Sequence, residues 1–353
     1  MFKHFVFKTG ICIFLGVSAS GFSGCGGTEL ENKSFPLAVL ISEQDGQYKS
    51  CYLSQQLSEV ANERADGGNM TAESASGSTY YETHKTFEKN NRSQLDTSHT
   101  KAVIFQQEFL TGGTLETFLE TVRRENTYAR NTLVYLSDSS MEKLEKLNSS
   151  LEVPLGSYLE QMTENEKEIK EQAAVTLGTL LNEQANASRT LLVPVIQEKR
   201  GTPQIHAYEV LQNFKPKGRI GLDEAQIYYL LAGQLSQMDI YLNRKEQLRL
   251  INMKCRRNFV MSDGKVTEQI VLTAQAEHVT GTASRSAAER TVKERIERIC
   301  RAGMEQGIDL SDSARYLPLH APDVYRVYGR QAERYRENLE FDVLVQIRMI
   351  SRQ

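Results

Sequence analysis

The segment Leu339–Met349 most constrains the fold, because apolar and polar residues alternate along nearly all of it. Successive side chains of a strand point to opposite faces of a sheet, so one face of this strand must be buried. A hairpin with strands over Arg249–Met261 and Lys265–His278 is predicted by the turn residues between them, Asp263-Gly264. A capping box at Ser286-Ala287-Ala288-Glu289 starts a helix with one apolar stripe, made by Val292, Ile296, Ile299 and Cys300. For residues 246–353 we therefore predict an α+β domain, an antiparallel sheet packed on a long helix.

The first part of the chain has a different order of elements. Strands are predicted over Pro36–Ser42, Ser50–Gln56, Lys101–Phe105 and Asn131–Ser137. Before the last of these lies a helix whose apolar face is made by Leu115, Phe118, Leu119 and Val122. Capping boxes at Ser139-Ser140-Met141-Glu142 and Thr163-Glu164-Asn165-Glu166 predict two more helices, the second a long one through Leu181. The order β-α-β-α favours an α/β domain with a mixed sheet over residues 25–190.

Two further segments complete this outline. Residues 62–79 are small and polar, which is typical of an exposed mobile loop. Residues 191–245 contain two strand-like runs, Leu191–Gln197 and Gln204–Leu211, and then a helix from Asp223. We expect them to form a smaller middle α/β domain, so the fold class predicted is multi-domain, α/β and α+β.

Residues 1–24 have the features of a lipoprotein signal peptide. Two lysines precede an apolar stretch, Thr9–Ser20, that is too short to span a bilayer but has the length of a secretory h-region. The following Phe22-Ser23-Gly24-Cys25 resembles a bacterial lipobox, which predicts lipid attachment at Cys25. The alternative is an ordinary cleaved signal peptide with an incidental cysteine. A diacylated Cys25 would hold the mature chain firmly on a membrane.

Charge and cysteine content narrow the function classes. The formal net charge is −3, and cleavage after residue 24 removes two lysines and no acidic residue, so it becomes −5. Without a dense basic block, a nucleic-acid partner is not expected. Three cysteines remain besides Cys25, without a C-x-x-C spacing, so a zinc site is not supported. The sequence leaves open whether Cys255 and Cys300 form a disulfide or stay buried free thiols.

Candidate catalytic serines occur in two S-x-x-K patterns. Ser140-Met141-Glu142-Lys143 fits the pattern of penicillin-binding proteins, but Ser98-His99-Thr100-Lys101 fits equally well. Ser140 also lies at a predicted helix start, which gives it a structural role. The motifs of lipases, zincins and P-loop proteins are absent from the sequence. We therefore predict no enzyme and no cofactor.

Binding residues are equally scattered. The histidines of the mature chain have no i, i+4 spacing for a metal, and we expect structural roles for His84, His99, His206, His278 and His320. Arginines crowd residues 285–301, but glutamates are interleaved with them, which favours a solvated, salt-bridged helix face over a phosphate site. Tyr325, Tyr328 and Tyr335 lie among arginines, typical of an amphipathic helix with packed rings, or of an interaction surface.

Taken together, the chain resembles the C subunit of bacterial spore germinant receptors, the Ger(x)C lipoprotein family. The strongest stretch is Leu95–Leu147, with His99, a short apolar strand, Glu108, an apolar helix ending near Arg123 or Arg124, and Arg130. Ala207–Gly233 and the C-terminal module also match in order and spacing. The chain departs from the family pattern at Gly26-Gly27, where Trp-Asp is common, and at Asp309–Asp312, where a Gly-rich turn is common.

The resemblance implies a non-enzymatic lipoprotein on the outer face of the spore inner membrane. It implies membrane-embedded A and B subunits as partners, and a requirement in nutrient-triggered germination. Two other functions remain open: an extracytoplasmic solute-binding lipoprotein that serves a transporter, and a cell-envelope hydrolase that uses Ser140.

Overall fold

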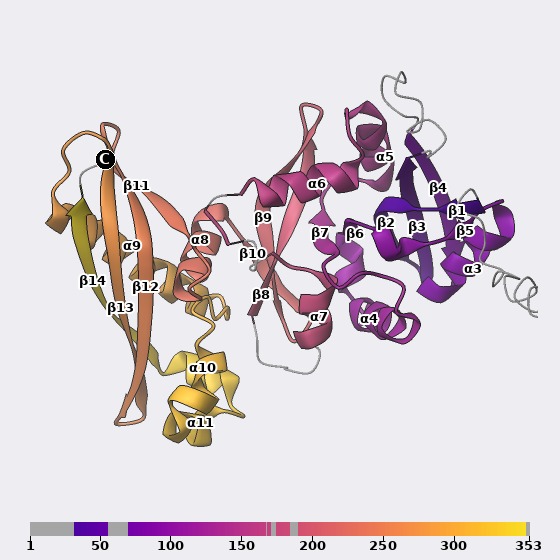
Figure 1. The fold of residues 1–353 in the computed structure, drawn as a ribbon. Coiled ribbons are helices and arrows are strands. Elements are labelled where there is room, and N and C mark those ends of the chain that lie inside the picture. The colour runs from indigo at the N-terminus through magenta and orange to yellow at the C-terminus, as the bar shows by residue number, and fades with distance from the viewer. Residues whose placement is uncertain (1–31, 56–69, 167, 171–173, 184–189, 351–353) are drawn as a thin grey trace, which may run out of the picture.

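A computed structural model describes residues 32–55, 70–166, 168–170, 174–183 and 190–350. Two large sheets lie at opposite ends of an elongated molecule, with helices packed on each and one helix between them (Figure 1). This mixed, multi-sheet architecture confirms the predicted fold class.

The first sheet has eight strands in the order β10-β9-β8-β7-β6-β2-β3-β4. The strands β2, β6, β7 and β8 run parallel, and the other neighbours pair antiparallel. Their bounds are β2 Pro36–Gln44, β3 Gln47–Gln55, β4 Met70–Gly77, β6 Ala102–Gln106, β7 Leu133–Ser137, β8 Thr190–Lys199, β9 Thr202–Gln212 and β10 Lys215–Ile220. A separate parallel pair joins β1 Lys33–Ser34 to β5 Gln94–Leu95.

Helices cover both faces of this sheet (Figure 1). One face carries α3 Tyr80–Asn90, α4 Thr114–Glu125 and α7 Leu177–Glu183, and the other carries α5 Met141–Ser150 and α6 Leu155–Glu164. Short 3-10 turns lie at η3 Thr97–His99 and η4 Gln107–Leu110. Val39 and Ile41 of β2 pack into the first layer, and the alternate residues Ala38 and Leu40 into the second. Burial on both faces explains why the central strands are continuous apolar runs.

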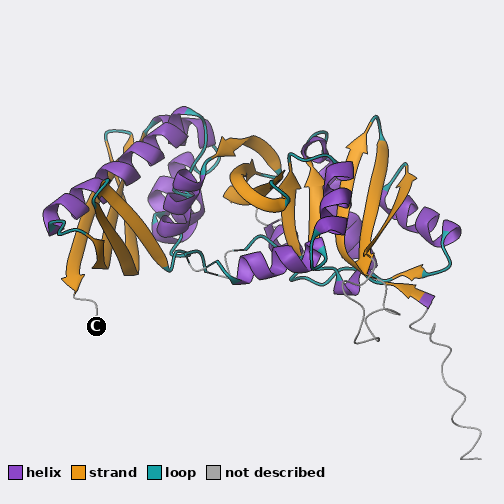
Figure 2. Ribbon diagram, turned by 90° about the horizontal axis from the view of Figure 1, so that it is seen from above, coloured by secondary structure: helices purple, strands orange, loops and turns teal. Residues whose placement is uncertain are grey.

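The second sheet has the order β11-β12-β13-β14 and is covered on one face by helices (Figure 2). Its strands are β11 Gln237–Asn243, β12 Glu246–Ser262, β13 Lys265–Thr280 and β14 Leu339–Ile350. Its helices are α8 Leu222–Leu231, α9 Arg285–Glu305, α10 Ser313–His320, α11 Pro322–Tyr328 and α12 Ala332–Glu337. The predicted stripe of α9 is buried, and β14 alternates buried and exposed residues as predicted from the sequence.

One pairing in this sheet differs from the expected antiparallel order, because β14 runs parallel to β13. The connection between the two strands contains α9, whose 21 residues span about 31 Å at 1.5 Å per residue, followed by the short helices α10, α11 and α12. This long crossover returns the chain to the beginning of β13, so the next strand enters in the same direction. An alternating pattern records which face is buried and carries no information on strand direction.

Two local predictions were wrong. The long helix expected through Leu181 is interrupted, since α6 ends at Glu164 and α7 begins at Leu177. The backbone between them bonds to neighbouring segments instead: Lys170 N–H donates to Gln234 O, and Val134 N–H donates to Val175 O. Within the predicted loop 62–79, β4 pairs along β3 as an edge strand that its small polar residues can form; residues 62–69 lie outside the described part.

The helix starts also shifted by one or two residues. Ser140 rather than Ser139 is the N-cap of α5, and Ser284 rather than Ser286 is the N-cap of α9. The Glu289 carboxylate therefore does not close a capping box. Its Oε1 accepts a hydrogen bond from Ile347 N–H of β14, at 2.9 Å.

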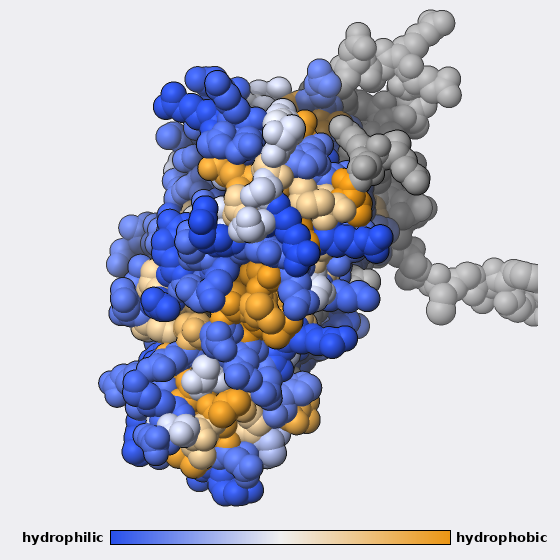
Figure 3. Space-filling view, turned by 90° about the vertical axis from the view of Figure 1, so that its left-hand side faces the viewer, coloured by the Kyte–Doolittle hydropathy of each residue, from blue (hydrophilic) through white to orange (hydrophobic). Residues whose placement is uncertain are grey.

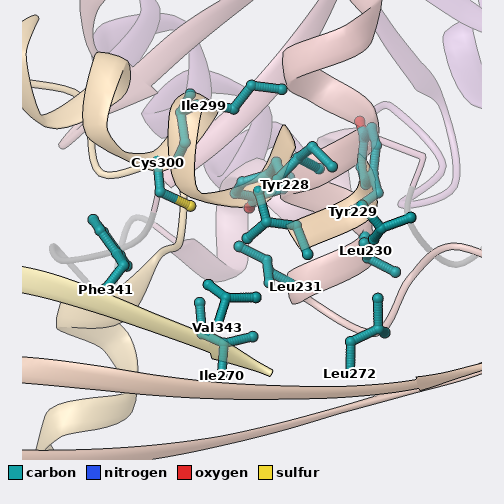
Figure 4. Packing of buried hydrophobic residues seen from close by; sticks show 14 of the residues in the cluster. Tyr228, Tyr229, Leu230, Leu231, Ile270, Leu272, Ile299, Cys300, Phe341 and Val343 are labelled. Carbon is teal, nitrogen blue, oxygen red and sulfur yellow. The ribbon is translucent and has the colours of Figure 1, made fainter. Parts of the chain in front are cut away.

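Residues of α8 pack with α9 and the C-terminal sheet in one core (Figure 4), and this core extends into the first sheet. Tyr228, Leu230 and Leu231 of α8 pack with Ile270, Val343 and other residues of the C-terminal sheet, and the same cluster contains Leu192 and Val210 of β8 and β9. The strands of the expected middle segment 191–245 are therefore shared between two sheets. Strands β8–β10 belong to the first sheet, and β11 belongs to the second. The domain boundaries stay a prediction.

Gly156 tests the packing of α6 on β2. A Cβ placed there would lie 2.0 Å from Leu37 O, far inside contact distance. Alanine normally stabilises a helix relative to glycine, but here we expect Gly156→Ala to lower the free energy of unfolding by about 1–3 kcal/mol. Urea unfolding of the purified protein measures this, with Ser157→Ala on the same helix as the control. A stabilised Gly156→Ala variant would contradict the close approach.

Candidate functional site

The two serine motifs have structural roles. Ser140 Oγ accepts from Lys143 N–H at 3.4 Å as the N-cap of α5. Ser98 Oγ donates to Asp96 Oδ1 at 2.5 Å. The Lys101 ammonium, which would be the base of that second motif, forms an ion pair with Glu160 at 2.9 Å. In neither motif does the structure record a bond between the serine hydroxyl and the lysine amine.

The histidines lie apart. His278 and His320 are exposed, and His99 packs edge-on against Phe35 with ring centroids 5.5 Å apart. His84 lies between Tyr52 and Tyr80, and burial lowers its pKa from 6.5 to about 4. Over the described residues, no group of three or more His, Cys, Asp or Glu side chains could hold a metal ion.

The three described cysteines are free thiols. Cys51 is buried in β3 and Cys300 in α9, while Cys255 of β12 is half-buried. Burial raises the pKa of Cys51 to about 12 and that of Cys255 to about 11. The Cys255–Cys300 disulfide that the sequence left open is not formed.

A polar cavity of about 460 Å³ opens where β6 and β7 begin. His99 and Lys101 precede β6, Asn131 precedes β7, and Glu160 of α6 and Thr176 close the other side. The Lys101–Glu160 ion pair lies in the cavity wall. His99, from the stretch that carries the family resemblance, therefore lines this cavity.

A cluster of charged residues lies at the opposite, carboxyl ends of β6 and β7. Arg219 of β10 donates to both carboxylate oxygens of Asp138 at 2.7 Å, and to Gln107 Oε1 at 2.8 Å. Its Nε lies 3.2 Å from Glu209 Oε2, and His206 Nε2 lies 2.9 Å from Asp138 Oδ2. The hydrogen bonds from Arg219 lower the pKa of Asp138, whereas burial raises that of Glu209. The cluster ties β10 to the strand ends and leaves Arg219 fully engaged.

A second polar network is buried where the C-terminal sheet meets the first sheet. Arg257 of β12 and Glu268 of β13 form an ion pair at 2.5 Å, with side chains 4% and 0% exposed. Ser311 Oγ donates to Glu268 Oε2 at 3.0 Å and to Asp309 Oδ1 at 2.9 Å. Burial raises the pKa of Glu268, and Arg257 offsets part of that increase.

The same loop reaches the first sheet at Thr190, the first residue of β8. Thr190 N–H donates to Asp312 Oδ1 at 3.0 Å, and Thr190 Oγ1 donates to Asp309 O at 3.2 Å. Asp312 has a φ of 52°, in the left-handed region that favours glycine. Where a Gly-rich turn is common in the family, this chain has Asp312, and its carboxylate accepts a hydrogen bond from the backbone of β8.

Sequence reasoning missed both polar networks. Arg219 and Asp138 are 81 positions apart, and Thr190 and Asp312 are 122 apart. No short motif links such positions, and only the fold brings them together. Cys25, the predicted lipid attachment residue, lies outside the described residues.

The comparisons identify the class of protein. Residues 26–198 match the family model of the spore germination protein N-terminal domain. The N-terminal half of the chain is therefore a spore germination protein N-terminal domain, which confirms the resemblance to the Ger(x)C family seen in the sequence. Its fold is similar to the crystal structure of the GerBC protein, with a TM-score of 0.56 and 14% sequence identity over 91% of this chain and 100% of that chain. No curated protein matches the chain.

His84 makes stability depend on pH. Its pKa is about 4 in the folded chain and near 6.5 when unfolded, so the unfolded state binds more protons between these values. Stability therefore falls as the pH decreases from 6.5 to 4, by up to about 3 kcal/mol. We expect His84→Gln to flatten this part of the profile in urea unfolding, whereas His278→Gln at an exposed site leaves it unchanged. An unaltered slope in His84→Gln would contradict the assignment.

Removing one partner of the buried ion pair tests the second network. Glu268→Ala leaves the Arg257 guanidinium buried without its counter-charge, so we expect a loss of about 3–5 kcal/mol in unfolding free energy. Replacing both residues with apolar ones, Arg257→Met and Glu268→Leu, should cost less. As a control, Asp323→Ala breaks an exposed pair with Arg326 and should cost under about 1 kcal/mol. Equal losses for Glu268→Ala and Asp323→Ala would show that burial of the pair is unimportant.

Proposed function

We propose that this protein is a non-enzymatic lipoprotein subunit of a nutrient germinant receptor, anchored through a diacylated Cys25. It acts with the membrane-embedded A and B subunits at the outer face of the spore inner membrane and is required for nutrient-triggered germination. The observation that carries the proposal is the family match over residues 26–198. The fold likeness to the GerBC protein over 91% of the chain supports it.

The absence of a spanning helix among the described residues is compatible with this role. None of the helices in that part of the chain is long and apolar enough to cross a membrane. Each methylene of an acyl chain contributes about 0.8 kcal/mol to membrane binding, so a diacylated cysteine holds the body in place. Confinement at the membrane raises the effective concentration of the subunits, which reduces the affinity that assembly requires.

The position of β1 adds a geometric constraint. Lys33, the first residue of β1, follows Cys25 by eight positions, so the two are at most about 29 Å apart. In Figure 1, β1 and the four-stranded sheet lie at opposite ends of the molecule. The anchor would therefore keep the first sheet close to the bilayer and leave the C-terminal sheet free to reach other subunits.

Replacing the anchor cysteine tests the proposal. We expect deletion of the gene to abolish release of dipicolinic acid in response to at least one nutrient, and the wild-type chain to restore it. Cys25→Ala should appear in the soluble fraction and restore the response weakly or not at all. Cys12→Ala, which removes a cysteine within the apolar leader, is the matched control and should behave as wild type. A Cys25→Ala chain that stays on the membrane and restores full release would contradict the anchor.

The polar cavity beside His99 and Lys101 favours a second function, capture of a small solute for a transporter. This function predicts that a solute raises the melting temperature of the purified protein. Lys101→Met, which removes the ammonium group from the cavity wall, should abolish that rise. Deletion spores that respond to every nutrient tested, together with a solute-dependent rise in melting temperature, would favour this function over a receptor subunit.

A further inference from the structure

Strand β14 is the last strand of its sheet, and within the described residues only β13 pairs with it. It is 12 residues long and keeps its register with β13 without a bulge. It contains no proline, glycine or lysine, which are residues that often protect a free sheet edge from pairing. Figure 3 looks at the molecule from the side on which β14 lies in Figure 1, and it shows apolar patches among hydrophilic residues.

The bond from Ile347 shows which backbone groups face the free edge. Its N–H donates to Glu289 Oε1 of α9, not to β13. In a strand, alternate residues direct their N–H and C=O groups to opposite sides. The backbone N–H and C=O groups of Phe341, Val343 and Val345 therefore point to the free edge as well. Of these donors, Glu289 accepts a hydrogen bond only from the N–H of Ile347.

The sequence of β14 is complementary to itself when read in the opposite direction about Leu344. On the solvent face, Glu340 would lie opposite Arg348, Asp342 opposite Gln346, and Leu344 opposite Leu344 of a second copy. On the core face, Phe341 would lie opposite Ile347, and Val343 opposite Val345. Pairs of opposite charge and pairs of apolar side chains stabilise neighbouring strands. Moving the centre to Val345 would keep one pair of opposite charge, Asp342 with Arg348, but it would place Glu340 opposite Ile350 and Leu344 opposite Gln346, so the apolar pair on the solvent face would be lost.

We propose that the free edge of β14 binds a second copy of this chain, with the two strands antiparallel about a two-fold axis at Leu344. The two four-stranded sheets then form one continuous sheet across the dimer. Val343 and Val345 exchange backbone hydrogen bonds with each other's copies, and Ile347 N–H leaves Glu289 for Phe341 O of the second copy. The two-fold axis makes each pair away from the axis occur twice, so the Glu340–Arg348 attraction counts double and adds to the pair that Glu340 forms with Lys265 of its own chain.

Cysteine cross-linking of the full chain tests the contact and its register. Leu344 is 51% exposed, and its position on the axis brings two copies of residue 344 within disulfide range. We expect Leu344→Cys, purified in detergent and mildly oxidised, to form a disulfide-linked dimer. Leu319→Cys on α10, where the leucine is 84% exposed, is the matched control and should not. Equal cross-linking of both variants, or none in Leu344→Cys, would overturn the proposal.

Charge exchange provides an independent test that needs no new cysteine. Glu340→Arg places like charges opposite each other twice, so we expect the dimer dissociation constant in sedimentation to rise roughly tenfold. The exchanged variant Glu340→Arg with Arg348→Glu restores the attraction and should return the constant close to that of wild type. A wild-type chain that remains monomeric at all concentrations would overturn the proposal and leave the edge for a strand of a different protein.

Discussion

The second half of helix α8, residues 227–231, is apolar and buried on every side, and the arrangement of the two sheets depends on its burial. Ala225, Ile227, Tyr228 and Leu231 all lie in the core that joins Leu192 and Val210 of the first sheet to the C-terminal sheet. A helix without a polar face is stable in water only when other elements surround it. Neither sheet alone covers α8, so both must be in place for the chain to exclude water from it.

Polar contacts give this apolar junction a defined geometry. Tyr228 of α8 donates its hydroxyl hydrogen to Thr190 O at 2.6 Å, and the loop at Asp309–Asp312 binds the same residue from the other side. Apolar packing alone has little directional preference. The hydrogen bonds at Thr190 therefore select one orientation of the C-terminal sheet, and the buried Arg257–Glu268 pair fixes the loop that supplies them.

The sequence predicted those elements that have one buried face and one exposed face. Alternation located β14, a 3.6-residue apolar stripe located α9, and the turn residues Asp263-Gly264 located the hairpin of β12 and β13. Elements whose backbone partners are distant in the chain were not predictable in this way. The helix expected through Leu181 had a capping-box sequence and helical periodicity, but Thr163 lies at the end of α6, and Ile169 and Thr176 form isolated bridges to Leu235 and Leu133. For the site, the sequence singled out His99 and Lys101 of the polar cavity, whereas the cluster around Arg219 depends on contacts across 81 and 112 positions.

Burial of the cysteine thiols also lowers their reactivity toward oxidants. Only the thiolate form of cysteine reacts readily with oxidants and disulfides. With a pKa of about 12, roughly one Cys51 side chain in 10⁵ is ionised at pH 7, and for Cys255, with a pKa of about 11, roughly one in 10⁴. The packing that builds β3 and β12 therefore also slows the oxidation of the Cys51 and Cys255 thiols.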